Sequence, residues 1–233
     1  MGAVINRVHL KALRAREEAR FLDTHKKSGA AFLESKKVMH EGVPMSWMAK
    51  WPGAHPVFVK EAKGARFTDI DGNTYVDFCL GDTGSMTGHS PDATVAAIRE
   101  QVGKGITAML PTEDAAIVSG LLRERFGLPL WQFTVSATDA NRHSIRYARL
   151  ITGKSKIIVI DKCYHGSVDE TFGTLDAQGN TIMREGNLGA PVPLAETTRV
   201  VEFNDLAAME AALSKGDVAA ILMEPAMTNI GIV

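Results

Sequence analysis

Apolar residues at the start of the chain follow a helical period. Between residues 5 and 39 they recur about every 3.6 positions, as on one face of an amphipathic helix. The residues that set this period include Val8, Leu10, Leu13, Ala19 and Leu22. We therefore predict a helix-rich first segment, which ends at the run HEGVPMSWMAKWPGAHP because prolines and glycines break helices.

A strand pattern comes next, in the motif DIDGNTYVDF at residues 69–78. Segments rich in β-forming residues flank Asp71-Gly72, and this dipeptide favours a hairpin because the primed turns need positive φ. We predict a β-hairpin here. The glycine-rich run LGDTGSMTGHSP follows it as a loop, and a helical pattern then extends from Pro91 to Val102.

Strand and helix patterns alternate from residue 112 onward. The predicted helices are Glu113–Phe126 with Thr112 as N-cap, Thr138–Ile151, and a helix capped by Asn204 that ends at Leu213. The predicted strands are Trp131–Val135, Lys156–Ile160, Arg199–Phe203 and Val218–Met223. Residues 172–195, rich in glycine and proline, are predicted to cross the surface. This alternation predicts an α/β domain with a mostly parallel sheet.

The composition is that of a globular protein with a core, because 45% of the 233 residues are apolar and 23% are charged. The formal net charge of -1 gives no electrostatic reason to expect nucleic acid or a membrane surface as partner. No apolar run approaches the roughly 20 residues that span a bilayer, and no signal-peptide pattern is present. Cys79 and Cys163 have apolar neighbours, which indicates reduced core thiols in a cytoplasmic protein.

The stretch TVSATDANRHSIRYARLITG, residues 134–153, places small and hydroxyl residues between a strand and a helix. Amides at a helix start lack partners within the helix and lie at the positive end of its dipole, so an anion binds well there. Ala137 leaves room for a phosphate to approach the main chain, and Ser136 and Thr138 add hydroxyl donors. The alternative is an ordinary capped helix without a ligand.

Two more segments carry polar residues just after a predicted strand. In CYHG, residues 163–166, Tyr164 can stack on a planar ring and His165 can hydrogen-bond beside it. In MEPAMTNIG, residues 223–231, Glu224 needs a cation or polar partner, and Asn229 is a neutral donor. The alternatives are locally satisfied loop residues and a glutamate paired with a surface arginine. Since ligands bind at the carboxyl ends of parallel strands, the three segments together predict one site.

As an ensemble, these motifs resemble the class III aminotransferases, which are pyridoxal-phosphate enzymes of fold type I. Within that family they resemble the glutamate-1-semialdehyde aminomutase-like and β-amino-acid transaminase branch. The resemblance runs from DxDGxxYxDF through GHSP and SATDANxxxxRxAR to YHG and EPxxxNxG. It implies a large α/β domain with helices on both faces of a mostly parallel sheet. Residues 1-80 would be a helix and hairpin segment of the small domain, and residues 81-233 the first part of the large cofactor-binding domain.

The resemblance also assigns residues to the cofactor, pyridoxal 5'-phosphate. The family usually has S-G-(S/T)-E-A-N where this chain has SATDAN, so Ala137 and Thr138 would hold the phosphate. Tyr164 would stack on the pyridine ring, and His165 would support the pocket. Glu224 matches a carboxylate that helps to gate the substrate site. Asn229 would lie close to the phenolic oxygen of the cofactor.

The resemblance further implies two groups that this sequence does not supply. The family needs an aspartate for the pyridine nitrogen and a lysine that forms a Schiff base, and both belong downstream of the EPxxxNxG segment. No lysine here matches that role, so the catalytic residue is unassigned and the chain alone is expected to be inactive. Because the chain stops at Val233 with no helix closing the sheet, we expect it to be the N-terminal half of a longer protein.

The predicted function is therefore transfer of an amino group between an amino acid, with β-amino acids among the candidates, and a keto acid. The resemblance implies a homodimer, and no metal is expected. The first alternative is an aminomutase, although relatives of that type carry an aromatic residue where Asp82 aligns. A second alternative is a non-catalytic truncated protein that binds phosphate-bearing ligands or a partner subunit. A Rossmann-type nucleotide binder is weakly supported because no G-x-G-x-x-G follows a strand.

Overall fold

A computed structural model describes residues 5–82, 84–227 and 230–231. The chain forms two compact units, Met1–Met109 and Leu110–Val233, and each is described by itself. The domain division after residue 80 rests on the family resemblance and stays a prediction.

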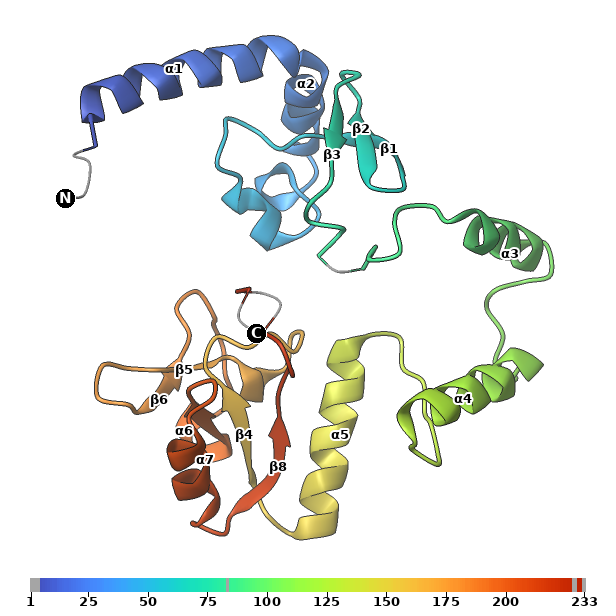
Figure 1. The fold of residues 1–233 in the computed structure, drawn as a ribbon, viewed down its shortest axis with the longest axis vertical. Helices are drawn as coiled ribbons and strands as arrows, with labels where there is room; N and C mark the ends of the chain where they lie inside the picture. The colour runs from blue at the N-terminus through green and yellow to red at the C-terminus, as the bar shows by residue number, and fades with distance from the viewer. Residues whose placement is uncertain (1–4, 83, 228–229, 232–233) are drawn as a thin grey trace. The chain divides into compact units, whose positions relative to one another are not determined.

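The first unit combines helices with a small antiparallel sheet of order β1-β2-β3 (Figure 1). Its elements are α1 (Arg7–Thr24), α2 (Lys26–Ser35), η1 (His40–Gly42), η2 (Ser46–Lys50), β1 (Val59–Lys63), β2 (Arg66–Asp69), β3 (Thr74–Val76) and α3 (Asp92–Val102). The predicted helix-rich start and the predicted hairpin at Asp71-Gly72 are confirmed. Gly72 has a φ of +97°, the positive value that this turn requires.

The acidic residues of the hairpin motif hold the turn together. Asp69 accepts hydrogen bonds from the main chain of Asn73 at 2.8 Å and from the Tyr75 hydroxyl at 2.9 Å. Asp71 accepts from the main-chain N–H of Ser28 at 2.9 Å, at the start of α2, where the helix dipole favours a carboxylate. The motif therefore fixes the hairpin and docks a helix onto it.

The second unit is an α/β fold. Its elements are α4 (Glu113–Phe126), α5 (Ala137–Thr152), β4 (Lys156–Ile160), η3 (Asp169–Thr171), β5 (Gly173–Leu175), β6 (Thr181–Met183), α6 (Leu194–Thr197), β7 (Thr198–Val201), α7 (Leu206–Leu213) and β8 (Val218–Leu222). Strands β7, β4 and β8 form a parallel sheet in that order, and β5 and β6 form a hairpin. The predicted α/β fold with a parallel sheet is confirmed.

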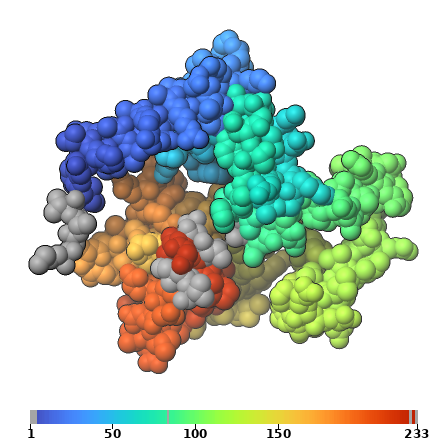
Figure 2. Space-filling model, turned by 45° about the horizontal axis from the view of Figure 1, so that its top comes forward, coloured from blue at the N-terminus to red at the C-terminus, as the bar shows by residue number. Residues whose placement is uncertain are grey.

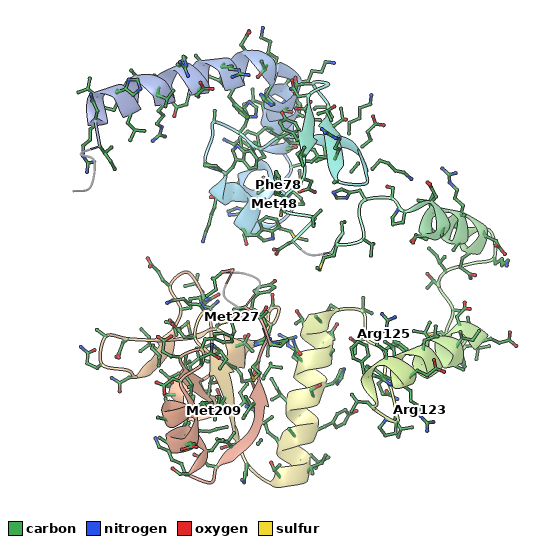
Figure 3. The ribbon with its side chains drawn as sticks, in the orientation of Figure 1. Met48, Phe78, Arg123, Arg125, Met209 and Met227 are labelled. Atoms are coloured by element: carbon green, nitrogen blue, oxygen red, sulfur yellow. The ribbon has the colours of Figure 1, made fainter. Side chains whose placement is uncertain are left out.

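The side chains of β4 alternate between the two faces of the sheet, and both faces are covered by helices. Ile157 and Val159 are completely buried and pack in one cluster with Ile145 of α5. Ile158 is equally buried but packs on the other face, with Ala212 of α7. Figure 3 shows Met209 on α7 and Met227 near the end of the sheet where β4 and β8 finish. This core fixes the positions of the loops that follow the two strands.

Three sequence predictions differ from the structure, and a fourth is incomplete. Trp131–Val135 is irregular rather than a strand, because it pairs with no strand in the described part of the chain and Val135 is fully exposed. Asn204 does not cap α7, since it has a φ of +63° and the side chain of Asp205 accepts from the N–H of Ala208 instead. Cys79 is exposed rather than in the core, while Cys163 is buried. The predicted surface excursion at residues 172–195 contains the β5–β6 hairpin.

Several helices present apolar side chains to solvent. Helix α4 has no buried residue, and it stands on the surface in the space-filling view (Figure 2, yellow-green). Its exposed apolar side chains are Ile117, Val118, Leu121 and Phe126. Across residues 5–82, 84–227 and 230–231, no helix is long and apolar enough to cross a membrane.

Candidate cofactor site

The start of α5 leaves main-chain amides open. Ser136 is the N-cap, and its hydroxyl accepts from the N–H of Asp139 at 3.2 Å. The first helical hydrogen bond runs from the N–H of Ala140 to the carbonyl of Ser136 at 3.1 Å. The amides of Ala137 and Thr138 therefore have no acceptor inside the helix, and they lie at its positive end. These two open amides lie where the sequence predicts an anion site.

The loop after β4 is joined to this helix start by hydrogen bonds. The Thr138 hydroxyl accepts from the N–H of Ser167 at 3.0 Å. One turn further along α5, the side-chain amide of Asn141 donates to the carbonyl of His165 at 3.0 Å. Because a hydroxyl can accept and donate at once, Thr138 keeps its own proton for a ligand.

Gly166 makes this close approach possible. Its φ is +76°, in the left-handed region, and a Cβ built on it would lie 2.2 Å from the Thr138 hydroxyl oxygen. Any other residue would separate the loop from the helix start. The glycine of the CYHG motif is therefore explained by the packing of the loop against Thr138.

Tyr164 and Glu224 meet after neighbouring strands. The main-chain N–H of Tyr164, following β4, donates to the carboxylate of Glu224, following β8, at 3.2 Å. The Glu224 side chain is half-buried, while 57% of the Tyr164 surface is exposed. The tyrosine ring is thus available to a ligand, with its main chain fixed from the adjacent strand.

His165 is the buried polar group of the site. Its exposed fraction is 8%, and its Nε2 has no hydrogen-bond partner within the described residues. Burial lowers the pKa of this imidazole, and the Glu224 carboxylate and a hydrogen bond with the Leu222 main chain partly oppose that shift. A neutral histidine with a free buried nitrogen calls for a polar partner.

The structure also shows a charged side chain that we did not predict from sequence. The Arg184 guanidinium donates from Nη2 to the carbonyl of Cys163 at 3.0 Å, directly before Tyr164. Arg184 follows β6 in the segment predicted to be a plain surface excursion, 21 positions away in sequence. No local pattern connects it to the CYHG motif, so only the tertiary structure identifies it.

Five of the six predicted cofactor residues come together at the carboxyl ends of β4 and β8. The loop after β4 carries Tyr164 and His165, and hydrogen bonds join this loop to Thr138, to α5 and to Glu224. Ala137 begins the same helix turn as Thr138. Asn229 lies outside the described residues. The open amides, the spare hydroxyl proton, the exposed ring and the unpartnered His165 nitrogen fit an aromatic phosphate ester such as pyridoxal phosphate.

Comparisons with known proteins identify the family of the chain. Residues 47–233 match the family model described as aminotransferase class-III. A curated relative, the glutamate-1-semialdehyde 2,1-aminomutase of Methanothrix thermoacetophila, is 32% identical over 205 residues, which are 88% of this chain and 47% of that protein. The chain therefore spans about half the length of such relatives.

Solved structures show the same likeness. A glutamate-1-semialdehyde aminomutase from Pseudomonas aeruginosa PAO1 is 50% identical with a TM-score of 0.92, over 98% of this chain and 51% of that one. A variant of that enzyme was solved in complex with PMP. A β-phenylalanine aminotransferase from Variovorax paradoxus is 25% identical with a TM-score of 0.77, over 92% of this chain and 47% of that one. This chain belongs to the class III aminotransferase family.

Proposed function

We propose that the second unit holds pyridoxal phosphate in the cup formed by the start of α5 and the loops after β4 and β8. The hydrogen bonds that join Thr138 to Ser167 and Glu224 to Tyr164 carry this proposal, because they bring a phosphate seat and an aromatic ring together. When bound, the cofactor supplies an electrophilic carbonyl and a ring that stabilises negative charge on the substrate's amino-bearing carbon.

The residues of this chain have separate tasks in the cup. The amides of Ala137 and Thr138 and the Thr138 hydroxyl bind the phosphate, with the dipole of α5 adding to the attraction. Tyr164 lies against the ring. His165, kept neutral by burial, offers its free nitrogen as a hydrogen-bonding group to the cofactor. Glu224 and Asn229 are assigned to the substrate side and to the phenolic oxygen of the cofactor by family resemblance.

For the reaction, we propose movement of an amino group within one substrate, as in an aminomutase. The 50% identity with the Pseudomonas aminomutase, against 25% with the Variovorax aminotransferase, favours this over transfer between two substrates. Transfer between an amino acid, including β-amino acids, and a keto acid remains the second candidate. The observation that favours it is Asp82, an exposed carboxylate where the resemblance expects an aromatic residue in aminomutases.

The two candidates differ in their need for an acceptor. We would supply glutamate-1-semialdehyde, without any keto acid, to the protein that carries this chain. Formation of the isomer with its amino group on carbon 1 supports the aminomutase. Turnover of a β-amino acid only when a keto acid is added would replace it with the aminotransferase.

The 233-residue chain by itself is proposed to bind the cofactor without turnover, because none of its lysines matches the family's Schiff-base position. We also propose a homodimer for the whole protein. Light scattering of that protein would test the dimer, and a monomeric mass under assay conditions would contradict it. Full turnover by the 233-residue chain would show that a lysine within it performs the reaction.

A further inference from the structure

Arg184 directly follows β6 at the end of the β5–β6 hairpin, and its side chain contacts the loop that carries Tyr164. Its own main-chain N–H donates to the carbonyl of Phe172 at 2.8 Å, which anchors it to the hairpin. The side chain is half-buried, and its Nε atom is buried without a partner within the described residues. A long charged side chain held inward in this way loses hydration, so its remaining contacts have to compensate.

The guanidinium joins two segments through their carbonyls. Nη2 donates to Cys163 at 3.0 Å and to Gly173 at 3.3 Å. Cys163 directly precedes Tyr164, whose N–H is held from the other side by Glu224 at 3.2 Å. The Arg184 cation thus holds the main chain at Cys163, and the Glu224 anion holds it at Tyr164. The two side chains follow β6 and β8, which are distant in sequence from this loop. Charge-assisted bonds of this kind are stronger than neutral ones.

The electrostatics of the loop agree with this geometry. Burial raises the pKa of the Cys163 thiol to about 11, and the Arg184 cation acts against that rise. The same cation works with burial to lower the pKa of His165, while Glu224 opposes it. Arg184 therefore lowers the pKa values of Cys163 and His165, the residues on either side of Tyr164, and Glu224 raises them.

We propose that Arg184 is a positioning residue, which holds the Cys163–Ser167 loop so that Tyr164 and His165 face the cofactor. This proposal rests on the cofactor cup described above. In this proposal Arg184 acts without contacting the cofactor. Its effect passes through the Cys163 carbonyl. Lysine cannot fully reproduce the planar guanidinium, which places Nη2 between two carbonyls.

The first test measures the loop without any cofactor, through the reactivity of the buried Cys163 thiol. In a Cys79→Ser background, the full chain is treated with a thiol reagent under native conditions. We expect Arg184→Met to speed the labelling of Cys163 by about tenfold through local opening, with Arg184→Lys in between.

Arg199→Met is the matched control. Arg199 is also half-buried and also donates to a main-chain carbonyl, that of Ala212 at 3.2 Å, but it belongs to β7. Labelling rates are compared after correction for each variant's stability in urea. Equal corrected rates for Arg184→Met and Arg199→Met would overturn the proposal, because the role of Arg184 would then be general stability.

The second test titrates the same variants with pyridoxamine phosphate, which needs no lysine for binding. We expect the dissociation constant to rise about tenfold for Arg184→Met and to stay within about twofold for Arg199→Met. Unchanged affinity of Arg184→Met beside faster labelling would overturn the link to the cofactor. Absence of binding by the parent chain would instead refute the cofactor cup, while the labelling result would still decide whether Arg184 holds the loop.

Discussion

Replacement of Gly166 by alanine is the sharpest perturbation of the cup. The added Cβ would lie 2.2 Å from the hydroxyl oxygen of Thr138 and 3.1 Å from its Cα. Backbone atoms of a helix start cannot move away as a flexible side chain would. Alanine would also have to adopt the φ of +76° that Gly166 has. The substitution therefore combines backbone strain with a steric overlap.

The two contributions can be separated with Gly179. That glycine has a φ of +80°, but a Cβ built on it would meet nothing within 4 Å. Gly179→Ala should cost only the left-handed backbone penalty, about 1–2 kcal/mol. Gly166→Ala should add a further overpacking cost of about 1–3 kcal/mol. The difference between the two variants isolates the contact between the loop and α5.

Urea unfolding of the parent chain and both variants measures this difference, and pyridoxamine phosphate titration follows on the same samples. We expect Gly166→Ala to lose more stability than Gly179→Ala and to bind the ligand more weakly. The loop would be pushed away from Thr138, while the turn at Gly179 is remote from it. Equal destabilisation and equal affinity in the two variants would refute the close packing of Gly166 on Thr138.

Three further predictions concern single side chains. Thr138→Val should weaken pyridoxamine phosphate binding by about 1–2 kcal/mol in a titration, while Thr138→Ser keeps it; equal loss in both would argue against a hydroxyl donor. Burial lowers the pKa of His165 below its usual 6.5, so stability is complete above that value and falls as acid protonates the unfolded state. Urea unfolding at about pH 7.5 and about pH 5.5 should show this loss, and a His165→Gln variant with the same pH dependence would contradict it. Thiol titration of the native chain should modify the exposed Cys79 but not the buried Cys163; equal reactivity would contradict the burial of Cys163.

Local sequence signals predicted the parts of the fold that local physics controls. The Asp71-Gly72 dipeptide predicted the hairpin correctly because a positive φ is needed to close that turn. The continuous apolar run at Lys156–Ile160 gave the central strand because both faces of β4 are buried. The hydroxyl residue before α5 gave the helix start because Ser136 does cap it.

The predictions that failed depended on tertiary contacts. Trp131–Val135 has strand-forming residues, but an extended segment becomes a strand only when another strand pairs with it. Asn204 and Asp205 are both good cap residues, and the chain path after β7 decided between them. Arg184 carries no motif, because its partner carbonyl belongs to a segment 21 residues earlier. Contacts of this kind exist only in the folded chain.

In the proposed site, the start of α5 and the loop after β4 hold a pyridine ring that carries a phosphate. Titration of the chain with pyridoxamine phosphate tests it most directly, with Thr138→Val and Tyr164→Ala measured beside the parent. We predict saturable binding that each variant weakens by about tenfold. No saturation up to about 1 mM ligand, or the same affinity in both variants as in the parent, would contradict the account.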